Sequence, residues 1–473
     1  LDEVVIIGYG EQARTKNVGA VGQIKQEELS KVASSSFEGQ IAGKMSGVIV
    51  NQSNGQPGAS SQIVIRGTGT LTAGTNPLIV VDGYPLTEGS SLNDLNPDDI
   101  ANINVLKDAA SASIYGSRAA NGVILVTTKK GNKKSETVFS LDVYGGIQEK
   151  STEYELVDAY DFAQYITEAR NWGYVSKDPA NRSETDPNSV RVNKKFNGQG
   201  IDGRELYLDF LQPYLDGQEG LVNTDWMDVA FRTAEISNYN LSASGGNEKT
   251  KFYTSLGFFD QEGIVIGTDL KRYSFATNLE TQITDKIKIG TNIKASFTDQ
   301  NQLDQSSRSS GALALSSLNL PYYSPYTADG ALNISDQIIN EQREIEGVRI
   351  NGTPVENLLA TARNVKDNRV NFRTFGNIFL EAELLKNLKY KLSLGGDYDN
   401  YNRNFYYPSD VGSYRTPAPR SDAEASQTKR SRVNYIIENT LIYDNTFKKH
   451  HVNVLGGYTF QKENINTTVV NGT

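Results

Sequence analysis

Apolar and polar side chains alternate with a period of two over most of the chain after residue 134. In the segment 287–297, isoleucine, threonine, alanine and phenylalanine occupy the odd positions, and lysine, glycine, asparagine and serine the even positions. A period of two places successive side chains on opposite faces of a β-strand. Such segments predict strands with one apolar and one polar face, about 10 residues or longer, which suffices to cross a bilayer when tilted.

The predicted strands differ in how they are connected. They are 136–148, 237–245, 250–260, 271–283, 286–299, 369–382, 387–402, 430–443 and 449–463. Even-numbered strands are followed by short turns, whereas three odd-numbered strands are followed by long connections, 149–236, 300–368 and 403–429. Alternation alone suits a soluble sandwich equally well, but short turns at one rim and long loops at the other are typical of an outer-membrane barrel.

We therefore predict an antiparallel membrane β-barrel. Bacterial barrels of this kind have even strand counts, and an odd count leaves an unpaired edge, so the barrel is expected to be incomplete here. The polar phase of the strands, including Asn292 and Lys294, is expected to line the lumen, and the apolar phase, including Ile289 and Ile293, to face lipid.

The first 134 residues have a different texture and predict a compact mixed α/β unit. Short apolar runs bounded by turn residues predict buried strands at 48–50, 63–65, 78–81 and 123–127. A helix-capable stretch is expected at 97–120, opened by Asp98 and Asp99. With Asp94, these acids are interpreted as helix-opening residues rather than as an acid–base pair for glycoside hydrolysis.

Composition excludes several classes of function. The 473 residues include 47 Lys and Arg against 56 Asp and Glu, a net charge of −9, which argues against nucleic acid as a partner. The absence of cysteine removes disulfides, thiolate metal sites and cysteine nucleophiles. The two histidines, His450 and His451, fit a solvated strand end better than a triad or a metal site. No apolar run approaches the roughly 20 residues of a spanning helix.

The segment Val4–Ala13 contains a Gly-x-Gly-x-x-Ala pattern after an apolar run, as in a dinucleotide-binding turn. The required context is missing, because residues 15–22 show no apolar helical stripe and no second strand ending in an acidic residue follows cleanly. We interpret the segment as an extended strand near a free terminus that can add to the sheet edge of another protein.

A set of short motifs follows in order along the first 300 residues. They are Leu1–Gly10, Gly39–Lys44, Gly47–Val48, Gly55–Gly58, Ile63–Gly67, Pro77–Gly83, Val105–Asp108, Ile114–Arg118, Gly122–Ile124, Thr127–Lys129, Thr224–Trp226, Ser242–Asn247 and Phe258–Gly263. Together they resemble the SusC/RagA class of TonB-dependent outer-membrane transporters. The first motif is similar to the TonB box of that class, the last three to its barrel, and the others to its plug.

The resemblance implies a domain organisation. Residues 1–10 correspond to a TonB box, 11–134 to a plug domain in the lumen, and 135–473 to the N-terminal part of a transmembrane barrel of roughly 22 strands. The TonB-binding residues are then Asp2, Glu3, Val4, Val5, Ile6, Ile7 and Gly8.

The resemblance also implies a function, namely TonB-dependent import of oligosaccharides or peptides across the Gram-negative outer membrane. The implied partners are TonB with ExbB and ExbD, a SusD-like surface lipoprotein and the lipid of the outer membrane. Neither catalysis nor a cofactor nor a metal ion is expected.

Two arginines of the plug are candidates for holding it inside the barrel. Arg66 and Arg118 each lie between small or apolar residues, where an unpaired guanidinium would be costly. Acids on the polar phase of the strands, such as Asp142 and Glu280, are candidate partners. We predict a plug–barrel latch made of these four residues, the alternative being that the arginines are ordinary surface residues.

Aromatic residues gather in and beside the long connections, as Tyr322, Tyr323, Tyr326, Tyr401, Tyr406 and Tyr407. Such rings suit contact with a sugar, a peptide or the lipoprotein, and they equally suit the aromatic girdle at a membrane interface. Residues 156–172 predict an amphipathic helix with Val157, Tyr160, Ala163 and Ile166 along one side. We expect this helix to pack on the lipoprotein or on the barrel rim.

Two other classes of function are weighed against active import. A passive porin or adhesin barrel without energy coupling gives no reason for a terminal strand followed by a folded plug. A secreted carbohydrate-binding protein or enzyme rich in β-structure would not place long and short connections on alternate rims. The sequence therefore favours active import.

Overall fold

The structure is a computed structural model of the chain. It describes residues 4–7, 10–13, 21–29, 36–52, 54–59, 61–67, 74–87, 92–151, 155–191, 205–303, 312–334, 356–412, 420–448 and 450–473. Over these ranges, no helix combines the length and the apolar character needed to cross a membrane.

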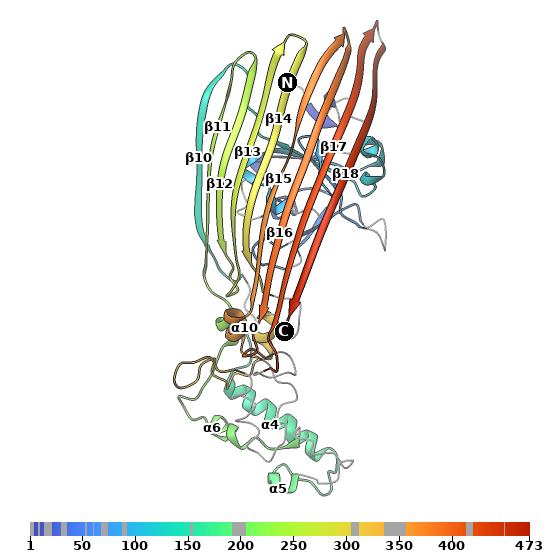
Figure 1. The fold of residues 1–473 in the computed structure, drawn as a ribbon. Coiled ribbons are helices and arrows are strands. Elements are labelled where there is room, and N and C mark those ends of the chain that lie inside the picture. The colour runs from blue at the N-terminus through green and yellow to red at the C-terminus, as the bar shows by residue number, and fades with distance from the viewer. Residues whose placement is uncertain are drawn as a thin grey trace.

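Nine antiparallel strands form one large curved sheet in chain order (Figure 1). They are β10 (Ser135–Gln148), β11 (Ala234–Gly246), β12 (Thr250–Glu262), β13 (Asp269–Thr284), β14 (Ile287–Asn301), β15 (Lys366–Leu385), β16 (Leu388–Tyr407), β17 (Glu424–Phe447) and β18 (His450–Gly472). The sheet is open, with β10 and β18 at its edges, so the prediction of an incomplete antiparallel barrel wall is confirmed. The last two strands extend well beyond the predicted 430–443 and 449–463.

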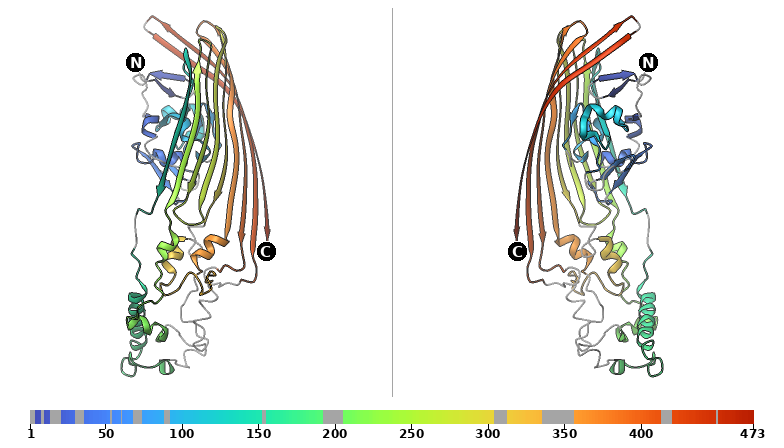
Figure 2. Two further views of the ribbon diagram at one scale, coloured as in Figure 1. Left: turned by 90° about the vertical axis from the view of Figure 1, so that its left-hand side faces the viewer. Right: turned by 90° about the vertical axis from the view of Figure 1, so that its right-hand side faces the viewer.

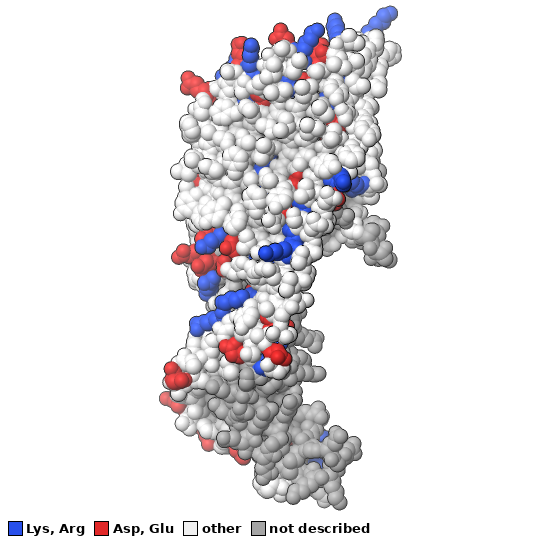
Figure 3. Space-filling view, viewed as in Figure 1, with Lys and Arg blue, Asp and Glu red and all other residues white. Residues whose placement is uncertain are grey.

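The two faces of the sheet differ as the alternation predicts. On β14, Asn292 and Lys294 are each 4% exposed, whereas Ile289 and Ile293 are 39% and 37% exposed. The surface seen in Figure 3 carries a broad band with few charged side chains between charged groups at its upper rim and near its lower end. A polar inner face and an apolar outer band are what a membrane barrel requires.

An aromatic row crosses the outer face of four neighbouring strands. It consists of Tyr239, Phe258, Tyr273 and Phe297, which are direct partners in the strand registers. Their ring centroids are separated by 6.3, 5.0 and 6.3 Å in turn. Aromatic rows of this kind mark the interface between lipid and water.

The N-terminal unit lies against the concave face of the sheet (Figure 2). Its five-stranded sheet has the order β3 (Val21–Lys25), β8 (Ile100–Leu106), β9 (Val123–Thr128), β6 (Leu78–Val81) and β7 (Tyr84–Pro85), and only β6 and β9 are parallel. Two hairpins, β1 (Val4–Ile7) with β2 (Gly10–Ala13) and β4 (Val48–Gln52) with β5 (Ser61–Ile65), accompany it. Buried aliphatic residues such as Ile24, Ile103 and Val126 form its core.

The predicted helix at 97–120 is wrong over its first half. The segment begins as a 3₁₀ helix, η3 (Pro97–Asp99), and continues as strand β8 before the short helices α3 (Ala109–Ala112) and η4 (Ser113–Ala119). Ile100, Ile103 and Val105 are fully buried between β3 and β9. Burial of these β-branched side chains in a sheet outweighs the helix-opening signal of the acids before them.

The other helices in the described ranges are short, apart from α4 (Ala159–Val175). The short ones are α1 (Gln26–Leu29), α2 (Phe37–Ile41), η2 (Leu92–Asp94), α5 (Asn188–Arg191), η6 (Asp209–Leu211), α6 (Gln212–Leu215), α7 (Trp226–Ala230), α8 (Ala312–Leu318) and α10 (Leu358–Asn364). Helices α4, α6 and α10 lie beyond the end of the sheet that is opposite the short turns (Figure 1).

Helix α4 confirms the predicted amphipathic helix, although it begins later than residue 156. Asp158 caps it by accepting a hydrogen bond from the Asp161 backbone N–H, which leaves Val157 outside the helix and exposed. Ala163 is buried on the predicted side, in a cluster that joins the first long connection to Tyr322 of the second. The apolar side of the helix therefore packs within these connections.

Candidate functional site at the plug–barrel interface

The tight turn between β6 and β7 brings a carboxylate of the plug to the wall of the barrel. Asp82 and Gly83 both have positive φ, 48° and 85°, so the turn is tight and the Asp82 side chain points to β14. Asp82 forms an ion pair with Lys294, and their side chains are only 2% and 5% exposed. Thr128 donates to the same carboxylate from its backbone N–H and its hydroxyl, at 2.9 and 2.5 Å.

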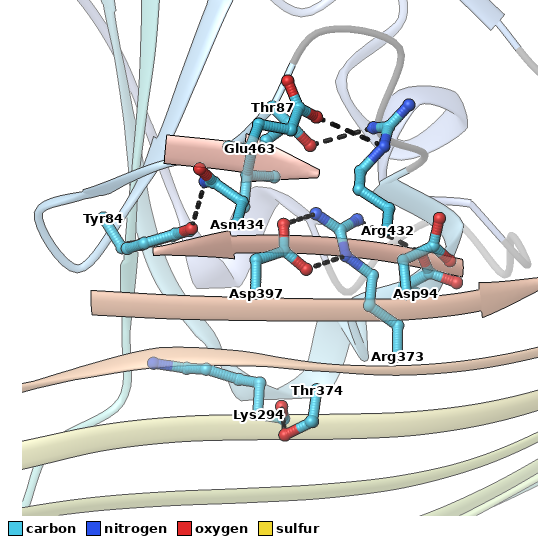
Figure 4. Close-up of polar contacts among 12 residues, drawn as sticks. Tyr84, Thr87, Asp94, Lys294, Arg373, Thr374, Asp397, Arg432, Asn434 and Glu463 are labelled. Carbon is cyan, nitrogen blue, oxygen red and sulfur yellow. Dashed lines mark hydrogen bonds and ion pairs between the residues drawn. The ribbon is translucent and has the colours of Figure 1, made fainter. Parts of the chain in front are cut away.

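A second ion pair joins the plug to β15 and β16. Arg373 pairs with Asp94 of the plug at 3.2 Å and with Asp397 of β16 at 2.8 Å, and all three side chains are at most 7% exposed. Figure 4 shows the guanidinium between the two carboxylates. Asn371 donates to Asp94 at 3.3 Å, and the Phe375 ring lies 4.9 Å from the guanidinium. One cation therefore holds a plug acid and a wall acid together.

The segment before β8 supplies a row of contacts to β11 and β12. Asn96 caps η3 by accepting from the Asp98 backbone N–H, as the helix-opening interpretation requires. The side-chain bonds to the wall are Asn96 Nδ2 to Asn240 Oδ1 (2.9 Å), Asn238 Nδ2 to Asp98 Oδ2 (2.8 Å), Tyr253 Oη to Asp99 Oδ1 (2.8 Å) and Ser255 Oγ to Asp99 Oδ1 (2.5 Å). The acids that open the short helix therefore also attach the plug.

Two hydroxyl groups of the plug complete the interface, one in β7 and one just after it. Asn434 of β17 donates to the Tyr84 hydroxyl at 2.7 Å, and Arg432 donates to the Thr87 hydroxyl at 2.9 Å (Figure 4). Gly395 of β16 leaves room for the Tyr84 ring, because a Cβ at this position would approach the ring within 2.5 Å. The wall is thus shaped as well as charged to receive the plug.

The two buried acids of the plug differ in their pKa. Burial alone would raise the pKa of Asp82, but the ammonium groups of Lys294 and Lys130, with hydrogen bonds from Lys294 and Thr128, outweigh it and lower the pKa. Burial raises the pKa of Asp99, despite the hydrogen bonds from Ser255 and Tyr253. Asp82 is therefore charged at neutral pH, which is the state that holds Lys294.

The predicted latch is corrected at Arg66 and Asp142. Arg66 follows β5 with a φ of 56°, and its backbone N–H donates to the carbonyl of Gly47 at 2.9 Å. Its side chain is exposed, and no carboxylate among the described residues pairs with it. Asp142 is exposed on β10. The small residues around Arg66 serve a turn, so they do not bury its side chain.

Arg118 and Glu280 do join plug and wall, but to other partners. Arg118 donates to the Gln461 side chain of β18 at 3.0 Å and to the Leu86 carbonyl at 2.9 Å. Glu280 of β13 pairs with Lys130, which follows β9, at 3.4 Å and with Lys251 of β12 at 3.0 Å. The four predicted latch residues are therefore not brought together.

The predicted TonB-binding residues are described in part. Val4–Ile7 form the extended strand β1, which pairs with β2 of the same chain. Asp2, Glu3 and Gly8 lie outside the described residues. Binding of this segment to TonB stays a prediction.

The six predicted aromatic contact residues have three kinds of surroundings. Tyr322 and Tyr407 are buried, Tyr322 against Phe162 and Tyr323, and Tyr407 with its hydroxyl donating to the Gly412 carbonyl. Tyr326 and Tyr406 are exposed by 39% and 45%. Tyr401 is half-buried on the inner face of β16. Tyr407 lies an even number of positions from Tyr401 on the same strand, so these two rings share the lumenal phase of the wall.

Sequence reasoning missed the residues that carry the two buried ion pairs. Asp82 was visible as part of a turn, and Arg373 and Asp397 occupy the inward phase of their predicted strands. Their pairing has no sequence signal, because 212 residues separate Asp82 from Lys294 and 279 separate Asp94 from Arg373.

A polar plug bound to the inner face of a barrel wall is the architecture of TonB-dependent receptors. Residues 14–123 match the family model of the TonB-dependent receptor plug domain. The structure of the RagAB peptide importer in a closed state superposes with a TM-score of 0.72 and 25% identity, covering 96% of this chain and 49% of that chain.

Two curated relatives place the chain more narrowly. It is 31% identical to the TonB-dependent receptor SusC of Bacteroides thetaiotaomicron over 446 residues, which cover 88% of this chain and 40% of SusC. It is 30% identical to TonB-dependent receptor P3 of Formosa agariphila over 468 residues, 98% of this chain and 40% of that receptor.

These matches confirm the resemblance to the SusC/RagA class and, with it, the outer membrane as the location. The chain spans about two fifths of the length of these two curated relatives. Both relatives are named as TonB-dependent receptors.

Proposed function

We propose that this chain forms the plug and part of the barrel of an active importer that moves oligosaccharides or peptides across the outer membrane. Residues 1–10 would bind TonB, which works with ExbB and ExbD, residues 11–134 would close the lumen, and residues 135–473 would form part of the wall. A SusD-like lipoprotein would cover the extracellular side. We propose no enzymatic activity.

The observation that carries this proposal is the polar attachment of the plug. Buried apolar surface contributes about 25 cal/mol per Å², so a plug held by apolar packing alone would be costly to displace. The pairs of Lys294 with Asp82 and of Arg373 with Asp94 are instead directional, and water can replace each partner once the pair is separated. Such contacts hold a position and can be reformed.

The connectivity of the plug offers a path for force from the N-terminus. Among the strands that the structure describes, β3 is at the edge of the plug sheet and pairs with β8. β8 follows directly on Asp98 and Asp99, which bind β11 and β12. A pull on the N-terminal segment would therefore reach β8 and strain these two contacts first, before the ion pairs of Asp82 and Asp94.

The two alternative functions explain fewer features of the structure. A passive porin or adhesin barrel would not need a plug whose attachment is built from buried, exchangeable pairs. A secreted carbohydrate-binding protein would not place long and short connections on alternate rims of its sheet, as the strands from β10 to β18 do. We therefore propose energy-coupled import over both.

Deletion of residues 2–8 tests the energy coupling. The deletion should abolish energy-dependent uptake and leave barrel folding intact, as read from heat-modifiable migration in detergent. Replacement of Glu235, an exposed acid on β11, by alanine is a matched surface change that should leave uptake unaltered. Uptake that persists after the deletion and still needs the proton gradient would contradict the assignment.

A further inference from the structure

Three arginines on neighbouring strands face the lumen beyond the plug. They are Arg369 of β15, Arg403 of β16 and Arg430 of β17, and we call them the lumenal arginine cluster. Each lies an even number of positions from a buried inward residue of its own strand, Arg373, Asp397 and Asn434 respectively. All three side chains therefore lie on the plug-facing side of the wall.

The cluster lies between the plug and the long connections. Asn371, the inward residue between Arg369 and Arg373, still bonds Asp94 of the plug. Arg369 is the next inward position, roughly 7 Å further along the strand. β15 begins at Lys366, just after α10. The arginines thus occupy the wall of the extracellular mouth.

Two of the arginines oppose each other directly. Arg369 and Arg403 are partners in the register of β15 and β16, an arrangement that is unfavourable for like charges. Both converge on Asp367, with Nη2 to Oδ2 at 2.7 Å from Arg369, and Nε to Oδ1 at 2.6 Å from Arg403. Their side chains remain 30% and 38% exposed, although that of Asp367 is 7% exposed.

The third arginine is oriented by a ring. Arg430 pairs with Asp399 at 3.1 Å, and its guanidinium lies 5.2 Å from the ring centroid of Tyr401, its direct register partner. The Phe405 ring holds Arg403 in the same manner, at 5.3 Å. Packing on a ring fixes the plane of a guanidinium, so less conformational entropy is lost when it binds a ligand.

The neighbouring Arg373 shows what a structural arginine looks like in this wall. It is 2% exposed and lies between two carboxylates. In the cluster the ratio of positive to negative charge is reversed, because three partly exposed guanidiniums pair with two carboxylates, those of Asp367 and Asp399. This local positive charge stands out in a chain whose net charge is −9.

We propose that the lumenal arginine cluster binds carboxylate groups of the substrate, so that the imported oligosaccharide or peptide is an acidic one. The proposal rests on the proposed import function and narrows its substrate class. A guanidinium presents parallel N–H donors that match the two oxygens of a carboxylate, and the exposed edges of Arg369 and Arg430 face the entry path. The carboxylates belong either to uronic acid residues of a glycan or to acidic residues of a peptide.

Calorimetric titration of the purified full-length receptor in detergent tests this preference. The probes are hexaglutamate against hexaglutamine, and trigalacturonate against its methyl ester. At least one acidic probe should bind about tenfold or more tightly than its neutral counterpart, and added salt should weaken that binding. The acidic probe that binds identifies the source of the carboxylates. Equal affinity within both pairs, or no binding of either acidic probe, would overturn the proposal.

Variants assign the effect to the cluster. Arg430→Gln, and Arg369→Gln with Arg403→Gln and Asp367→Asn, should each remove most of the preference; Asp367 is changed because it would otherwise stay buried without its partners. Lys429→Gln is the matched control, since Lys429 precedes Arg430 on the opposite, exposed face of β17. An unchanged preference in folded Arg430→Gln would overturn the proposal, even if the triple variant failed to fold.

The test of the arginine cluster can fail or succeed independently of the test of the import function. Binding in detergent needs no energy source, whereas import does. Energy-dependent uptake of neutral probes with no acidic preference would leave the importer standing and reject the substrate class. Acidic preference in the titration, with no energy-dependent uptake in cells, would support the cluster and count against import.

Discussion

Successive residues on a strand of the large sheet face two different environments, the outside of the barrel and the plug. Ile293 faces outward and is 37% exposed, whereas Lys294, the next residue, is 4% exposed and paired with Asp82 of the plug. A Cβ added to Gly396, on the outer face, would have no neighbour within 4 Å, whereas a Cβ added to Gly395 would touch the Tyr84 ring. The same strand therefore satisfies lipid on one side and a folded domain on the other.

The two faces of the sheet place different requirements on their residues. The outer face needs only apolar or aromatic side chains at the right depth, without specific partners. The inner face needs a particular group at a particular height, since a buried charge without its partner is costly. The outer face should therefore accept the exchange of one apolar or aromatic residue for another. Most substitutions at the paired positions of the inner face should be destabilising.

Loss of the Asp82 charge is expected to have the largest effect. Asp82→Asn keeps the shape and the positive φ but leaves Lys294 buried without its anion, which should weaken plug attachment by about 3–5 kcal/mol. Hydrogen exchange of β6 and β9 in the folded receptor measures it. Asp142→Asn, at an exposed acid on β10, is the control and should change nothing. Adding Lys294→Met should recover part of the loss, and equal protection in Asp82→Asn and wild type would refute the anchor.

The cost of placing a lysine on the outer face is expected to depend on its depth in the membrane. Ile293→Lys, near the middle of β14, should reduce the free energy of barrel folding into vesicles by about 2–4 kcal/mol. Ile283→Lys, at the end of β13 near the short turns, should cost at most about 1 kcal/mol because the ammonium reaches the interface. Denaturant titration in vesicles compares them, and equal costs at the two depths would argue against lipid contact.

Two adjacent glycines give a finer comparison of the faces. Gly395→Ala places a methyl group within 2.6 Å of both Tyr84 and Ile436, and the overpacking should cost about 1–3 kcal/mol. Gly396→Ala should cost much less, because its methyl group has no neighbour within 4 Å. Protection of β7 by hydrogen exchange reads both variants. Equal protection of β7 in the two variants would show that the plug does not pack against β16 at Gly395.

The smallest expected effect is a loss of plug stability at acidic pH. The pKa of Asp82 is lowered in the folded protein, so its contribution to stability is fully present above the unfolded value near 3.8 and is lost as the pH falls through the folded pKa. Wild-type plug protection should fall more steeply than that of Asp82→Asn between about pH 4 and pH 2. Parallel pH profiles for the two proteins would mean that the ion pair does not set this dependence.

Features that repeat locally along the chain were predictable. The alternation on β14 and the short turn before it are properties of adjacent residues, and they predicted both the strand and the face that each side chain takes. The helix expected over Pro97–Ala120 failed where its local signal competed with burial of Ile100 and Ile103 in a sheet. The small residues around Arg66 predicted burial, although they form a turn that exposes the side chain.

The pattern of neighbouring residues was enough to predict the period of the strands, the polar character of their inner face and a separate mixed α/β unit before residue 135. That this unit is a plug was implied by the resemblance. The pairing of Lys294 with Asp82 and of Arg373 with Asp94 arises only in the folded protein, because strand register and the position of the plug select these partners across more than 200 residues. The same holds for the lumenal arginine cluster. Alternation places each arginine on the inner face, but the pairing of three strands brings them side by side.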